Sequence, residues 1–309
     1  MNKIFIGISA LFLIGSFILN TQLSKAGHRV KIQKEKYAEV LNFKARFLDP
    51  GEWTGDTAER NKLSKAEEYT QKAISYQSQS NLYMGIVLAS YVGFFLLTVF
   101  FARSNTEQGI VPFGITMIAL VCLHIGLTYP MLEITALERN LDIGSLPIKT
   151  KVMGFSVDLN IEQVFEGDMI FYYQSKSVLE LVGTLFEQKN WIVSISILSF
   201  SILFPLLKLI FTCLMLFAGR ASNNALAQFF VKYAGKWSMA DVFVVAVFLA
   251  YLAFSNMQVG ITTESNVLPG LYFFLGYCLL SILSSHLICL LYTSPSPRDR
   301  TRSRMPSSA

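Results

Sequence analysis

The sequence predicts an all-α polytopic membrane protein with six transmembrane helices, an external helical hairpin and a small external α+β cap. Hydrophobic residues make up 52% of the 309-residue chain and charged residues 15%. The mean hydropathy of +0.45 is higher than a soluble domain needs for one core. A bilayer is crossed by about 20 apolar residues. Stretches of this length are 83–102, 110–132, 191–218, 239–256 and 268–291.

A sixth apolar segment, residues 4–19, is shorter and comes first in the sequence. It follows Lys3 and precedes Ser24 and Ala26, which form a small-x-small pattern like that of signal-peptide cleavage sites. The segment is therefore either a cleaved signal or an uncleaved anchor, and Lys25 inside the cleavage region favours the anchor. Both alternatives place residue 27 outside the cytoplasm.

The charges of two short linkers predict the orientation, because cytoplasmic loops are enriched in Lys and Arg. Linker 219–240 carries three basic residues and no acidic one, whereas linker 257–267 has no Lys or Arg. We therefore expect the first linker and both chain ends to be cytoplasmic. The external loops would be 20–82 and 133–190.

The first external loop has the composition of a helical hairpin. Residues 24–48 and 57–80 are rich in Lys, Glu, Gln and Ala, which favour helices, and DPGEWTGD between them indicates a turn. The hairpin either tethers two spans or serves as a docking arm for an external partner. Candidate contacts of such an arm are Tyr69, Ile74 and Tyr76.

The second external loop predicts a small cap. LPIKTKVMGFSVDLNIEQVF alternates β-branched and aromatic residues around Gly154, and MIFYYQ follows, so short strands are expected. SVLELVGTLFEQKN then has the apolar spacing of an amphipathic helix that leads to Trp191 at the membrane interface. Residues 133–190 are therefore an α+β cap.

Cysteine placement and missing motifs argue against enzyme chemistry and a metal site. The four cysteines all lie in apolar segments and none forms a CxxC pair, so neither a disulfide framework nor a zinc ribbon is indicated. The sequence also lacks a Walker-type loop, HExxH and a nucleophile elbow. We therefore expect no enzyme activity and no cofactor.

The last 18 residues, 292–309, change abruptly to Ser, Pro and Arg. They are either a disordered basic tail beside anionic lipid or non-native sequence. The second reading is favoured, because the preceding helix stops without a natural exit. Four arginines against one aspartate in this tail supply most of the +5 net charge. The basic balance is therefore no argument for nucleic acid.

From about residue 110 to 291 the chain resembles the paraquat-inducible protein A family of inner-membrane proteins. The resemblance rests on TYPMLEI (128–134), FPLLKL (204–209), GKWSMADVFVVAVFLAYL (235–252) and PGLYFFLGYCLLSILSS (269–285). It implies a membrane component of a lipid transport system, phospholipid above all, working with a periplasmic MCE (mammalian cell entry) protein. The implied location is the inner membrane of a diderm bacterium.

The chain also departs from that family. Family members carry two four-helix modules and zinc-binding cysteines, whereas this sequence has one module, 103–291, and no such cysteines. Residues 1–102, which include the hairpin, have no counterpart in the family. A role that needs two modules would require two associated chains, that is, a homo-oligomer.

Lys208 lies inside an apolar span of the module, where a charge costs roughly several kcal/mol. The side chain therefore needs a partner or a functional role. Ser201, Pro205 and Lys208 share one helix face, and the proline predicts a kink that frees a carbonyl near Ser201. Asp241 at the start of the next span is the expected ion-pair partner. The resemblance implies a polar transport network of Ser201, Pro205, Lys208, Ser238, Asp241 and Ser281.

Three alternatives remain open at this point. Ser238 and Asp241 also fit a helix N-cap and its third position, which is a purely structural role. His124 and His286 are the two intramembrane candidates for haem b ligation, but their expected depths differ. The protein could finally be a scaffold or assembly factor that works through the hairpin and transports nothing.

Overall fold

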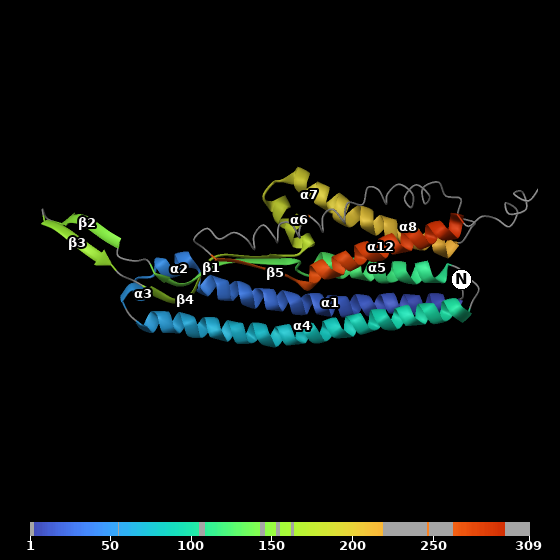
Figure 1. The fold of residues 1–309 in the computed structure, drawn as a ribbon, viewed down its shortest axis with the longest axis horizontal. Coiled ribbons are helices and arrows are strands. Elements are labelled where there is room, and N and C mark those ends of the chain that lie inside the picture. Colours follow the sequence, from blue (N-terminus) through green and yellow to red (C-terminus); the bar gives the residue numbers. More distant parts are fainter. Residues whose placement is uncertain are drawn as a thin grey trace, which may run out of the picture.

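The computed structural model describes residues 3–54, 56–104, 109–142, 146–152, 155–161, 164–218, 246 and 262–293. These residues form an elongated helical bundle with a sheet toward one end (Figure 1). We call the part that holds the sheet and the tip of the helical hairpin the cap.

Two long helices run the length of the molecule. Helix α1 (Lys3–Val40) and helix α4 (Asp56–Ser104) lie side by side in opposite directions (Figure 1). With 38 and 49 residues they are about 57 and 74 Å long, so both extend well beyond a hydrocarbon core of about 30 Å. Each helix therefore joins an apolar span to a polar arm. The short helices α2 (Phe43–Phe47) and α3 (Pro50–Thr54) connect the arms at the tip.

The central helix is α5 (Ile110–Thr128). In its most apolar stretch 83% of residues are buried, against 22% in α1 and in α4. Helix α12 (Pro269–Thr293) packs closely on it at Gly126, where an added Cβ would lie 2.8 Å from the Cα of Phe274. Only glycine allows this approach of the two backbones.

The remaining described span is broken into several helices. Helices α6 (Val178–Glu187) and α7 (Trp191–Ile197) lead into a π-helix, η1 (Leu198–Leu203), and then into α8 (Phe204–Ala218). Among the described residues, five helical segments are long and apolar enough to cross a membrane. The predicted span 239–256 lies outside the described residues except for residue 246, so six remains the expectation for the whole chain.

The cap contains a three-stranded antiparallel sheet. Strand β1 (Leu132–Asp142) lies between β4 (Val164–Lys176) and β5 (Thr262–Val267). Leu132 pairs with both Lys176 and Val267, so segments far apart in the sequence meet at one end of the bundle. Strands β2 (Leu146–Val152) and β3 (Phe155–Ile161) form a separate hairpin.

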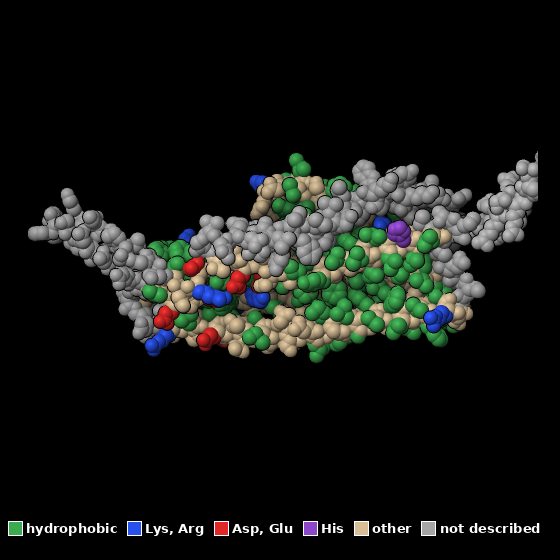
Figure 2. Space-filling view, in the orientation of Figure 1, with side chains coloured by type: hydrophobic (Ala, Val, Ile, Leu, Met, Phe, Trp, Pro, Cys, Tyr) green, Lys and Arg blue, Asp and Glu red, His purple; other side chains and the backbone are tan. Residues whose placement is uncertain are grey.

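The surface divides along the long axis. Figure 2 shows hydrophobic side chains over the helical end and most of the charged ones toward the cap end. Large apolar side chains are exposed on several of the spans, for example Leu11, Leu96 and Leu279. An apolar outer surface on helices of spanning length is what a bilayer requires. The cap lies outside that layer.

Candidate functional site

Lys208 and Ser281 meet between α8 and α12. The Lys208 Nζ donates a hydrogen bond to the Ser281 Oγ at 2.9 Å. Both side chains are buried, with exposed fractions of 8% and 4%. The serine oxygen is thus one of the groups that solvate the lysine within the spans.

The segment before Lys208 departs from regular helix geometry. Pro205 has no N–H to donate, and the residues before it form η1, in which the Phe204 N–H reaches the Ser199 carbonyl five residues back. The proline was expected to distort the helix, and the distortion takes the form of a π-helix before it. Ser201 lies buried inside it. Such π-bulges occur frequently at functional sites.

A second hydroxyl contact joins α5 to α12, one helical turn along from Ser281. The hydroxyl oxygens of Thr116 and Ser284 lie 2.6 Å apart, and the Ser284 Oγ lies 3.3 Å from the carbonyl oxygen of Pro112. Both side chains are fully or nearly fully buried. Sequence reasoning missed Thr116, although a threonine four residues after a proline inside a span was a signal that could have marked it.

Two members of the predicted network, Ser238 and Asp241, lie outside the described residues. The pairing of Asp241 with Lys208 therefore stays a prediction. The two histidines have different surroundings: the ring of His124 lies 4.7 Å from that of Phe17 on α1, whereas His286 is exposed on α12.

Ion pairs hold the α1 arm against the cap. The Lys31 Nζ lies 2.7 Å from Glu180 on α6, and the Lys34 Nζ lies 2.8 Å from Glu133 on β1. Ser177 and Glu180 also form a reciprocal capping box at the start of α6. Burial alone would raise the pKa of Glu180, but the hydrogen bonds from Lys31 and the Ser177 N–H outweigh it and lower that pKa.

The tip of the hairpin is fixed by a buried charge cluster. The side chains of Arg46 and Glu52 are fully buried, and the Arg46 Nε donates to Glu52 at 2.8 Å. The Arg46 Nη1 also donates to the carbonyls of Glu166 and Asp168 on β4. Lys62 on α4 reaches the other oxygen of Glu52 at 2.9 Å. The hairpin is thus docked on the sheet.

Of the three candidate contacts for an external partner, Ile74 is exposed and Tyr69 and Tyr76 are partly buried.

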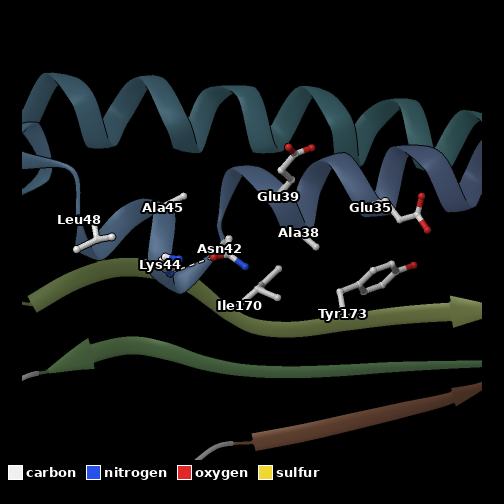
Figure 3. Close-up of a pocket in the computed structure, with 9 residues that line it drawn as sticks. All are labelled: Glu35, Ala38, Glu39, Asn42, Lys44, Ala45, Leu48, Ile170 and Tyr173. Carbon is white, nitrogen blue, oxygen red and sulfur yellow. Dashed lines mark hydrogen bonds between the residues drawn. The ribbon is translucent and has the colours of Figure 1, made fainter. Parts of the chain in front are cut away.

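Between the tip and β4 lies an open cleft of about 590 Å³ (Figure 3). Glu35 and Glu39 of α1 line it, together with Ile170 and Tyr173 of β4. Burial, followed by the nearby Glu133 and Glu35 carboxylates, raises the pKa of the Tyr173 phenol. The lining thus combines charged side chains with apolar ones, which include Ala38, Leu48 and Ile170.

These features define a multi-pass α-helical membrane protein with a buried lysine in its spans and a polar cap on one side. Residues 158–290 match the family model described as paraquat-inducible protein A. The match begins in β3, ends in α12 and contains all six residues of the predicted network. No curated protein and no solved structure shows significant similarity.

Proposed function

We propose that this chain is the membrane component of a lipid transport system, phospholipid above all, that works with a periplasmic MCE-type protein. The proposed setting is the inner membrane of a diderm bacterium, with the N-terminus in the cytoplasm. No catalytic step is part of the proposal. The observation that carries it is the buried Lys208–Ser281 contact inside the region that matches the family.

The physical reason is that a charge within the spans is stable only with partners. In the proposed mechanism, Lys208 and Asp241 share a proton or form an ion pair in one state and separate in the other. An uncompensated buried charge would bias the two arrangements by roughly a few kcal/mol. The Ser281 hydroxyl solvates the lysine in the arrangement seen here. The switch would open a lipid route between α8, the 239–256 span and α12.

The test is lipid transfer between membranes by the full chain together with its partner. Lys208→Ala and Asp241→Ala should each abolish transfer while the protein remains folded in the membrane. Ile210→Ala is the matched control, because Ile210 lies on the same helix but is exposed. Wild-type transfer by both charge variants would refute the mechanism. Absence of an MCE protein and phospholipid from intact native preparations would refute the function.

The second candidate function, a scaffold or assembly factor, is favoured by one observation. The hairpin is fixed by the Lys31–Glu180 ion pair to α6 and by hydrogen bonds from the buried Arg46 to β4 carbonyls, which gives a rigid surface for an external partner. Deleting residues 28–78 would also remove the Arg46 cluster, so a surface substitution, Ile74→Glu, separates the two functions better. If the protein is a scaffold, Ile74→Glu should abolish partner binding and Lys208→Ala should leave function unchanged. If it is a transporter, Lys208→Ala should abolish lipid transfer and Ile74→Glu should leave it unchanged.

A further inference from the structure

An apolar groove of about 560 Å³ lies among α1, α5 and α8. This volume is within the range of roughly 300–1,000 Å³ that small-molecule sites have. Asn20 and His124 are the two polar side chains that line it, and the others are Leu, Ile, Val and Phe. The apolar walls include Leu13, Ile14, Phe17, Leu120, Leu127 and Leu206.

The groove opens toward the bilayer and is closed toward the core. Ile14, Phe17 and Ile18 on the α1 wall are more than half exposed, whereas Val121 and Leu123 on the α5 wall are buried. A ligand would therefore enter sideways from the membrane. The molecules available there in quantity are lipids, and their acyl chains match an apolar lining.

The polar residues give the groove a direction. The Asn20 side chain donates to the Val121 carbonyl at 3.2 Å and accepts a hydrogen bond from Tyr91 at 3.1 Å, which fixes α1 against α5 and α4. The His124 Nδ1 is buried and has no hydrogen-bond partner among the described residues. It lies four residues before the cap-side end of α5, or about 6 Å along the axis.

We propose that this groove binds one acyl chain of a membrane glycerophospholipid, with the ester region of the lipid at His124. The polar end then lies near the interface and the apolar walls run toward the bilayer centre, which is the order of groups along the lipid itself. This site would be where the proposed transport system binds its lipid. That the bound lipid is the transported cargo rests on the proposed function.

The position of α8 connects the groove with the buried lysine. Leu206 lines the groove and Lys208, two residues later, contacts Ser281 on α12. Two residues correspond to about 200° around a helix, so the two side chains lie on nearly opposite faces. Helix α8 is therefore the shared wall, and any shift that accompanies a change in the partners of Lys208 also alters the width of the groove.

Photo-crosslinking tests the site. The full chain is placed in nanodiscs of phosphatidylethanolamine and phosphatidylglycerol that contain a phosphatidylethanolamine with a diazirine in one acyl chain. Crosslinked positions are then mapped by mass spectrometry. We expect crosslinks at residues 13–20 and 120–127 at fivefold or higher yield than on α4 around Leu96. Ile14 and Leu96 are 62% and 61% exposed, so contact with bulk lipid alone would label both regions equally.

Two tryptophan variants sharpen the test. Ile14→Trp fills the groove and should lower its crosslinking at least threefold, whereas the matched Leu96→Trp on α4 should leave it unchanged. Equal labelling of α1 and α4 in the wild type, or no effect of Ile14→Trp, would overturn the proposal. Melting temperatures of both variants check that neither is misfolded.

The same experiment separates this site from the transport function, because it needs neither partner nor transfer. If the wild-type protein is labelled in the groove but transports no lipid, the proposed binding site stands and the proposed function is refuted. Normal transport by Ile14→Trp without groove labelling would retain the function and overturn the groove as the cargo site.

Discussion

Replacing Arg46 by alanine removes the central cation of the cluster that fixes the hairpin to the sheet. Glu52 would remain fully buried with Lys62 as its neighbouring cation at 2.9 Å. Breaking a buried ion pair costs about 3–5 kcal/mol, and the two β4 carbonyls that lose their donor add to this. Lys62 offsets part of the loss. We therefore expect the free energy of opening the cap to fall by about 3 kcal/mol.

Hydrogen exchange of the full chain in detergent measures this change locally. A loss of about 3 kcal/mol corresponds to roughly 100-fold faster exchange for amides that exchange through opening of the cap. The effect should appear in residues 43–54 and 164–176 and be absent from α5. Lys72→Ala is the control, because its pair with Glu68 on α4 is exposed on both sides and should contribute little.

A double variant tests the cause of the loss. Arg46→Met combined with Glu52→Leu removes both charges together, and buried pairs replaced in this way often leave stability unchanged or higher. The double variant should therefore exchange more slowly than Arg46→Ala. Exchange in Arg46→Ala no faster than in Lys72→Ala would refute the reasoning, since the buried pair would then contribute no more than a solvated one.

Two further predictions concern the cap at low pH and the helix contact at α5. Because the folded pKa of Glu180 is lowered, its pair with Lys31 stabilises the protein above the ordinary value of 4.5 and loses this effect as the pH falls through the folded value. Glu180→Gln should lower the melting temperature at neutral pH and have no effect in acid below the folded pKa. Gly126→Ala should lower the melting temperature, because the new Cβ would meet Phe274 at 2.8 Å. Gly93→Ala, with nothing within 4 Å, should be neutral or stabilising by up to about 1 kcal/mol.

Much of the helical fold could be predicted from local sequence. The membrane class follows from apolar stretches of spanning length, and the hairpin from the runs of helix formers 24–48 and 57–80 on either side of DPGEWTGD. Both are confirmed. Strands β1 and β5 were not predicted, because TTESNV is short and polar and forms a strand only through its pairing with β1. Local propensity cannot show such a partner, because 119 residues, 143–261, lie between the two strands.

The candidate site divides in the same way. Lys208 stands out in the sequence because a charge in an apolar run needs an explanation. Its contact with Ser281 depends on how α8 and α12 pack and could be anticipated only through the family resemblance. Thr116 was missed because a lone hydroxyl in a span usually bonds to its own helix, as Thr116 does to Pro112, and its second contact lies on α12.

The N-terminal helices also affect how the matched region can work. Helix α5 lies entirely before residue 158, where the match to the family model begins. It nevertheless makes the polar contact to Ser284 and supplies a wall of the groove. Phe5 and Phe94, from α1 and α4, lie in the same buried core as Phe113 and Phe274. Removing α1 and α4 would expose a helix that is otherwise buried on most sides. Helix α1, which lies outside the matched region, thus supplies one wall of the groove, and if the groove binds lipid, variants in α1 should affect that binding as directly as variants in α8.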